Sequence, residues 1–213
     1  MPRLSRKEKQ AHTRSCLMES AARVFARRGL QQASIDEVAG DAGFTKGAFY
    51  ANFKSKEELF LAMLDDRFAQ RIEDIDRVWS SGGDLRDKAR QAGQDFADYL
   101  SDEEWSRLFF EFAAYAARNE EFRQELVTRY RALRERVADL YRGQKDRMGI
   151  EPAVPPDQVA AMIFAMANGL ALEKLLEPEV VPDDAFGTML VSFFSGLAAT
   201  ANAEAAAPAG GSS

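Results

Sequence analysis

The chain contains very little cysteine or histidine. Its 213 residues include one cysteine, Cys16, and one histidine, His12. A lone cysteine excludes an intramolecular disulfide and a multi-cysteine metal cluster, and we interpret Cys16 as a small helix residue rather than a redox sensor. A lone histidine in a charged segment is expected to be solvated. We therefore expect no metal site, no cofactor and no catalytic residues.

Long apolar runs and strand patterns are also missing. No uninterrupted run of 18 apolar residues occurs, so no membrane span is predicted. Residues 1–15 are basic but lack the apolar core of a signal peptide, so we expect a cytoplasmic protein. Apolar residues recur at spacings of three and four in most segments, and 46% of the chain is hydrophobic. These features predict an all-α protein.

Residues 34–59 contain three helix starts in a short stretch. Ser34 stands three residues before Glu37, which is the spacing of a capping box, and it begins a helix that Gly43 ends. Thr45 is the expected N-cap of a second, short helix with Phe49 and Phe53 on its inward face. Two helices joined by a tight turn are typical of a helix-turn-helix, in which the second helix reads DNA.

The third start is formed by Ser55 and Glu58, another capping box. The helix that follows keeps its apolar spacing as far as Trp79, so it spans roughly 36 Å and could transmit motion between two domains. A first helix is predicted over residues 13–28, ended by Gly29. Further helices are predicted over residues 87–100, 102–119, 121–147, 157–175 and 186–197.

The net charge of −6 is distributed unevenly. Residues 1–56 contain 11 Lys and Arg against 5 Asp and Glu, a net charge of +6, whereas the remainder contains 17 against 29, a net charge of −12. A basic segment on an acidic body fits a DNA-binding domain joined to one that does not bind DNA, although an ordinary solvated face would give the same count. Contact between DNA and a basic N-terminal arm stays open. That arm carries Arg3, Arg6, Lys7 and Lys9.

Three segments together resemble the TetR family of bacterial transcription regulators. They are AARVFARRG at residues 21–29, SIDEVAGDAGFTKGAFYANF at 34–53 and KSKEELF at 54–60. The resemblance is specific over about residues 13–68 and architectural beyond. It implies an all-helical homodimer whose first three helices form a DNA-binding head and whose last two helices form the dimer interface. It also implies that the head binds operator DNA until a small molecule enters the body.

The resemblance carries DNA contacts to positions in the head. Lys46 is the best candidate for a guanine contact, and Ala48 could meet a thymine methyl group. Tyr50 and Lys54 would contact phosphate, whereas Asn52 stands where the family often has histidine. The predicted DNA-binding residues are Ser34, Thr45, Lys46, Gly47, Ala48, Tyr50, Asn52 and Lys54.

The middle helices are rich in aromatic residues and methionine, which could line an apolar effector pocket or simply form the core. Glu111 and Asn168 would be the polar groups that orient a ligand. The predicted ligand-binding residues are Phe96, Trp105, Phe109, Glu111, Phe112, Tyr115, Met162, Met166 and Asn168. Small residues of the final helix, with Phe193, Phe194 and Leu197, suit a dimer seam. The small residues are Gly187, Ser192, Ser195, Gly196 and Ala198.

We therefore predict three parts: a DNA-binding helix-turn-helix domain with its basic arm at residues 1–54, a helical effector-binding and dimerisation domain at 55–200, and a disordered tail at 201–213. The predicted function is a ligand-responsive repressor that binds a palindromic operator as a dimer and is released by a small hydrophobic effector. The alternatives are an activator, or an all-helical small-molecule-binding protein or enzyme with an incidental helix-turn-helix. An enzyme is disfavoured because no nucleotide loop or metal-ligand spacing is present.

Overall fold

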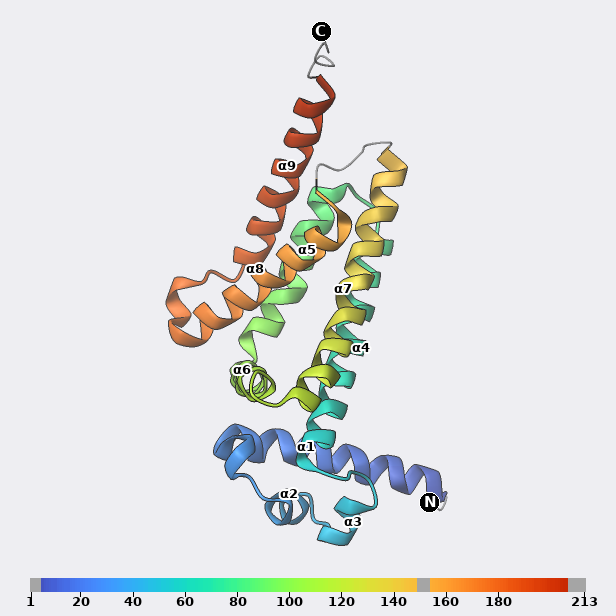
Figure 1. The fold of residues 1–213 in the computed structure, drawn as a ribbon, viewed down its shortest axis with the longest axis vertical. Coiled ribbons are helices and arrows are strands. Elements are labelled where there is room, and N and C mark those ends of the chain that lie inside the picture. The colour runs from blue at the N-terminus through green and yellow to red at the C-terminus, as the bar shows by residue number, and fades with distance from the viewer. Residues whose placement is uncertain (1–4, 149–153, 207–213) are drawn as a thin grey trace. The chain divides into compact units, whose positions relative to one another are not determined.

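The fold is described by a computed structural model, which covers residues 5–148 and 154–206 (Figure 1). Within these ranges every regular element is helical, which confirms the all-α prediction. The elements are α1 (Arg6–Gln32), α2 (Ile35–Asp41), α3 (Lys46–Tyr50), α4 (Lys56–Ser80), α5 (Leu85–Ser101), α6 (Glu103–Ala116), α7 (Glu120–Met148), α8 (Pro156–Leu176), the 3₁₀ helix η1 (Pro178–Val180) and α9 (Ala185–Ala206).

The helices form two compact units. The first contains α1–α3, α6, α4 as far as Ala69 and α7 as far as Arg129. The second contains α5, α8, η1, α9 and the remainders of α4 and α7. This division is by packing. The boundary predicted at residue 54 separates a DNA-binding domain from an effector-binding domain by function, and it stays a prediction. Of the tail predicted at residues 201–213, residues 201–206 belong to α9, and residues 207–213 lie outside the described part.

The core of the first unit is built on the apolar face of α1. Leu17, Ala21 and Phe25 are buried there, as their helical spacing predicts. Gly29 interrupts the helix with φ of 73°, a left-handed conformation that glycine adopts without steric cost. The freed N–H of Leu30 donates to Glu111 Oε1 at 2.6 Å. A short turn then completes α1.

Lysines from following helices satisfy the carbonyl groups at the ends of α1 and α4. Lys56 Nζ donates to the carbonyls of Leu30 and Ala33, each at 2.7 Å. In the second unit Lys88, whose side chain is buried, donates to the carbonyls of Trp79 at 2.7 Å and Ser81 at 2.6 Å. Such bonds replace the intrahelical partners that the last turn of a helix lacks.

The second unit is held together by a close crossing of α5 and α9. Gly93 and Gly187 face each other, and a Cβ added at Gly187 would lie 3.3 Å from Gly93 Cα. Next to this crossing the rings of Phe96 and Phe186 lie 4.2 Å apart between centroids. Gly187 is therefore buried inside the subunit. Its predicted place in a dimer seam is wrong, because two helix backbones approach at this position within one chain.

The apolar helix α8 is poorly covered. By length and composition alone it could cross a membrane, although no apolar run predicted a span. The sequence rule missed it because Asn168 and a few charged residues interrupt the run. Several large apolar side chains are exposed along α8 and η1, with Leu176 at 71%. They are Met162, Leu172, Leu176 and Val180. Exposed apolar surface of this kind is typical of an interaction site.

Candidate nucleic-acid interface

The turn between α2 and α3 has the predicted geometry. Ser34 Oγ accepts the N–H of Glu37 at 3.1 Å, and Glu37 Oε2 accepts the N–H of Ser34 at 3.0 Å, which completes the capping box. Hydrogen bonds from the Ser34 N–H and hydroxyl lower the pKa of the Glu37 carboxyl. Gly43 has φ of 74°, and its N–H donates to the Gly40 carbonyl at 3.0 Å. These contacts set the entry into α3.

The short helix α3 presents two distinct faces. Thr45 caps it, since its Oγ1 accepts the N–H of Ala48 at 3.2 Å. Phe49 and Phe53 are each 1% exposed and hold α3 on the core of the first unit. Tyr50 is 52% exposed. The packing thus leaves an outward surface on a short, rigidly seated helix, which is what a recognition helix requires.

Most of the predicted DNA-binding residues, on α3 and on the segments beside it, are exposed to solvent. Ser34, Thr45, Lys46, Gly47, Tyr50 and Lys54 are exposed, and Ala48 is half-buried.

Asn52 is arranged differently. Its Nδ2 donates to the Ala48 carbonyl at 2.8 Å, and its half-buried side chain is folded back on the turn of α3. This orientation lets the amide stabilise the end of α3. A contact between Asn52 and DNA stays a prediction.

Lys46 is held by an acidic residue from the preceding helix. Its Nζ lies 2.8 Å from Asp36 Oδ2, and both side chains are largely exposed. The hydrogen bond and the charge of Asp36 raise the pKa of Lys46. This pair ties the first residue of α3 to the first turn of α2. Sequence reasoning missed it because the two residues are ten positions apart and no local pattern pairs them.

Arg14 was also missed. Its guanidinium lies 4.2 Å from the centroid of the Phe53 ring, and NH1 donates to the Asn52 carbonyl at 3.2 Å. These contacts fix α1 beside the turn between α3 and α4. The residue belongs to the basic composition of the N-terminal segment, but its spacing from Phe53 along the chain gave no local signal.

The predicted ligand-binding residues are divided between the two units. Trp105, Phe109, Glu111, Phe112 and Tyr115 lie in the first, whereas Phe96, Met162, Met166 and Asn168 lie in the second.

The first group is packed around Phe112, which is fully buried and contacts the rings of Phe25, Phe60 and Phe122. Trp105 and Phe109 are also buried. Glu111 accepts the Leu30 N–H, so its carboxylate already has a structural partner.

In the second group, Asn168 Oδ1 accepts the hydroxyl of Tyr130 at 3.0 Å. Burial raises the pKa of Tyr130 to about 12, so this hydroxyl stays protonated and acts as a donor. The Tyr130 ring packs edge-on against Phe164, with 5.6 Å between centroids. Met162 is 43% exposed and Met166 is half-buried. The polar pair Tyr130 and Asn168 thus links α7 to α8.

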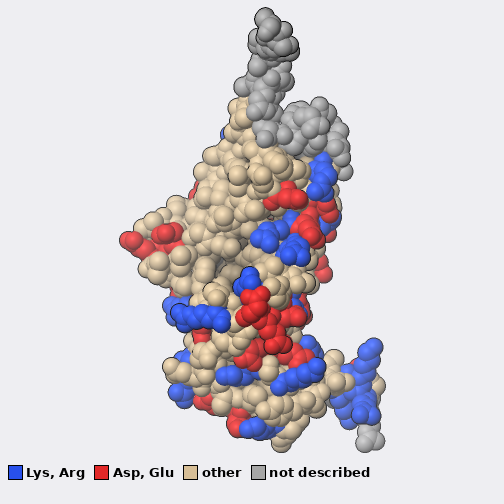
Figure 2. All heavy atoms as spheres, in the orientation of Figure 1, with Lys and Arg blue, Asp and Glu red and all other residues tan. Residues whose placement is uncertain are grey.

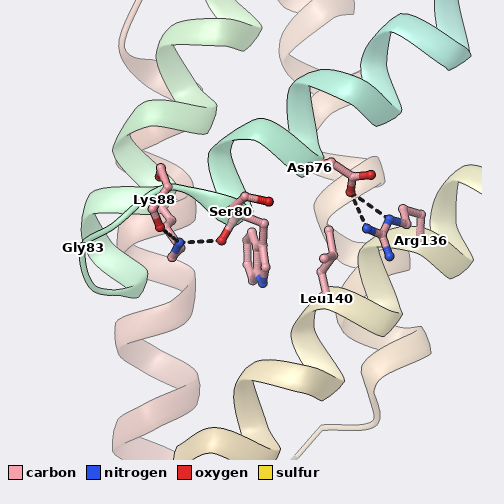
Figure 3. Close-up of a pocket in the computed structure, with 8 residues that line it drawn as sticks. Asp76, Ser80, Gly83, Lys88, Arg136 and Leu140 are labelled. Atoms are coloured by element: carbon pink, nitrogen blue, oxygen red, sulfur yellow. Dashed lines mark hydrogen bonds and ion pairs between the residues drawn. The ribbon is translucent and has the colours of Figure 1, made fainter.

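A pocket of about 370 Å³ lies in the second unit, where α4 ends and α5 and α7 pass (Figure 3). Arg136 and Asp76 form an ion pair on one wall, with 2.6 Å between Arg136 NH2 and Asp76 Oδ1, and the buried Lys88 lies on the other. None of the predicted ligand-binding residues lines it. Its lining residues are Asp76, Trp79, Ser80, Ser81, Gly83, Lys88, Arg136 and Leu140.

Two family models match the chain. Residues 17–63 match the bacterial regulatory proteins of the tetR family, and residues 85–199 match the C-terminal domain of BetI-type transcriptional repressors. The first match covers the helix-turn-helix and the second covers more than half of the chain. Both describe regulators, which confirms the expectation that the protein is not an enzyme.

Individual proteins that resemble the chain are also transcription regulators. An uncharacterised HTH-type transcriptional regulator of Bacillus subtilis, YfiR, is 28% identical over 183 residues, 83% of this chain and 87% of its own. The transcriptional activator FasR of Mycolicibacterium smegmatis is 34% identical over 110 residues, 51% of this chain and 48% of its own. The fold matches the fatty acid degradation regulator FadR of Bacillus halodurans with a TM-score of 0.74 and 15% identity, covering 85% of this chain and 93% of that one. The chain therefore belongs to the TetR family of bacterial transcription regulators.

Proposed function

We propose that this regulator is a cytoplasmic repressor that binds a palindromic operator as a homodimer and is released by a small hydrophobic effector. The observation that carries DNA recognition is the exposed surface formed by α3 and the turn after it. Lys46, held by Asp36, would face base edges, and Tyr50 and Lys54 would contact phosphate on either side. The capped turn and the buried Phe49 fix these groups before DNA arrives.

Homodimerisation is supported by the uncovered apolar surface of α8 and α9. Leu172 and Leu176 are exposed on α8, and small residues of α9 such as Gly196 and Ala198 are exposed as well. The surface of this part of the molecule is largely free of charge in Figure 2. A second copy of the chain offers the same surface, as a two-fold interface requires. Two heads could then bind two half-sites.

A hydrophobic effector is proposed from the apolar character of the helical body. The fold also matches FadR of Bacillus subtilis, a structure in complex with stearoyl-CoA, with a TM-score of 0.73 and 16% identity. That neighbour makes long-chain acyl compounds a reasonable first set to screen. An effector should raise the melting temperature and lower operator affinity together, because it binds one conformation preferentially. Compounds that stabilise the protein without changing DNA affinity would speak against induction.

Activation is the second candidate function, because FasR, one of the relatives, is a transcriptional activator. Activation and repression are distinguished by transcription in vitro from a promoter that contains an operator selected by the protein from random-sequence duplexes. A repressor lowers transcript yield when added, and an activator raises it.

DNA recognition is tested by operator selection from random-sequence duplexes, followed by mobility shifts with Lys46→Ala combined with Tyr50→Phe. We expect specific affinity to fall by roughly 10- to 100-fold, because a base contact and a phosphate contact are removed. The melting temperature should be nearly unchanged, since both side chains are exposed. Arg131→Ala on α7 serves as a control for the loss of one exposed arginine. Unchanged operator affinity would reject the assignment of α3.

A further inference from the structure

The first helix is longer than its packing requires. It begins at Arg6, where Ser5 Oγ accepts the Glu8 N–H at 3.2 Å and Glu8 Oε2 accepts the Ser5 N–H at 2.7 Å. The first buried side chain of α1 is Leu17. Residues 6–16, called the α1 extension below, therefore continue the helix for roughly 16 Å without a buried residue. A basic arm was expected here, and the structure shows that its described part is a capped helix.

Most of the positive charge in the rest of the head is used within the protein. Asp41 lies 2.6 Å from Arg23 and 3.3 Å from Arg27, between guanidinium NH2 and carboxylate oxygens. A second acidic residue, Glu37, lies 3.4 Å from Arg28. The side chains of Lys46, Lys56 and Arg14 also have partners, which are described above. The cations in ion pairs are therefore partly neutralised, whereas Lys56 and Arg14, whose partners are neutral, keep their charge but are held in place.

The α1 extension differs in this respect. Among the described residues, the side chains of Arg6, Lys7 and Lys9 form no hydrogen bond or ion pair, and all three are exposed. Figure 2 shows Lys and Arg gathered at this end of α1. Cations in the first turn of a helix are unfavourable, because the helix dipole is positive there, and neighbouring like charges repel. An outside anion would relieve both effects.

Arg14 fixes the direction of the α1 extension relative to α3. Its contacts with Asn52 and Phe53 place α1 beside the turn that connects Tyr50 to Lys54. The α1 extension thus leaves the head next to the two residues that would contact phosphate. A duplex whose major groove receives α3 has further phosphates on both sides of that groove, next to this part of the head.

We propose that the α1 extension binds the phosphate backbone of DNA flanking the half-site read by α3, with Arg6, Lys7 and Lys9 as the contacting residues. The contact carries no base information, because guanidinium and ammonium groups meet only phosphate oxygens. It adds affinity and salt dependence to both specific and non-specific binding. The proposal rests on DNA binding by the head and extends the protein's contact beyond the operator half-site.

The test compares the full-length wild type with Arg6→Gln/Lys7→Gln/Lys9→Gln on the operator that the wild type selects. Two duplexes are used, one trimmed to the operator and one with about one helical turn (~10 bp) of added sequence at each end. For the long duplex, the slope of log Kd against log salt should shrink by about 0.9 per lost contact, or up to about 2.7 per subunit. For the trimmed duplex the two proteins should bind alike.

A matched control removes three exposed arginines elsewhere, with Arg86→Gln/Arg118→Gln/Arg131→Gln. Its salt slope should equal that of the wild type. The proposal is overturned by an unchanged slope for the extension variant, by an equal loss in the control, or by an equal loss on the trimmed duplex. Circular dichroism should match the wild type and the melting temperature should not fall, because the replaced side chains are exposed and their charges disfavour the start of the helix. A wild type that selects no operator would instead reject the proposed function, and a random-sequence duplex would still test the phosphate contact.

Discussion

The pair of Lys46 and Asp36 places a negative charge on the surface that would approach DNA. Asp36 is exposed in the first turn of α2, and it neutralises the lysine that opens α3. An exposed ion pair of this kind adds little to stability. In the proposed complex with DNA its effect on recognition would be larger, because a phosphate and a carboxylate repel each other, whereas a base edge would offer Lys46 an acceptor that can replace Asp36. Under the proposed function, Asp36 would position Lys46.

We predict that Asp36→Asn raises affinity for random-sequence DNA by about two- to fivefold, the range expected for one exposed charge interaction. Operator affinity should rise less, so the ratio of specific to non-specific binding falls. Fluorescence anisotropy with operator and random duplexes at several salt concentrations measures both. Glu57→Gln, which removes one acidic charge at the start of α4, is the control. A variant with an unchanged ratio would show that Asp36 has no part in discrimination.

At the scale of the helices, the caps and turns that depend on neighbouring residues were predicted correctly from the sequence. The capping box at Ser34, the cap at Thr45 and the glycine turns at Gly29 and Gly43 depend on residues within four positions of each other. The start of α1 was predicted too late, because apolar periodicity begins only near Leu17. The capping box formed by Ser5 and Glu8 marks the true start of α1. It was not used because the polar residues around it suggested an arm without regular structure.

Contacts between distant segments were not predicted. Glu111 meets Leu30 across 81 positions, and Arg136 meets Asp76 across 60. Periodicity shows that a residue faces the interior but not which helix it faces. For this reason the aromatic residues of the middle helices were predicted as one possible pocket, although they belong to two units. The pocket in the second unit depends on such distant pairings, and no local pattern marked it.

The crossing of α5 and α9 depends on two glycines that no periodic pattern distinguishes. A Cβ added at Gly93 would overlap Gly187 Cα. We predict that Gly93→Ala lowers the free energy of unfolding by about 1–3 kcal/mol, because the two backbones would have to separate. Urea unfolding followed by circular dichroism measures the change.

Gly143→Ala on α7 is the matched control, since a Cβ there meets nothing within 4 Å. It should raise stability by up to about 1 kcal/mol through helix propensity. If Gly93→Ala were equally stabilising, the close crossing would be excluded.

At the scale of the whole molecule, charge and apolar surface are segregated. Unpaired cations gather at the end of α1, and uncovered apolar residues gather on α8 and α9. The packing of α9 also shows which of the residues predicted for the dimer interface are covered within the subunit. Phe194 is buried and stacks with Tyr141 inside the subunit, whereas Phe193 and Leu197 are half-buried and Ser195 is exposed. The side of α9 that the subunit leaves open is therefore the side available to a second copy.

We predict that Phe193→Glu combined with Leu197→Glu converts the protein to monomers, because two carboxylates would have to be buried in an apolar seam. Light scattering measures the mass. Operator affinity should fall by about 100-fold or more, since one head can no longer hold the second near its half-site. Thr128→Glu, at an exposed position of α7 outside the proposed interface, is the control and should remain dimeric. A double variant that kept the mass of a dimer would place the interface on another surface, and the exposed side chains of α8 would then need a different partner.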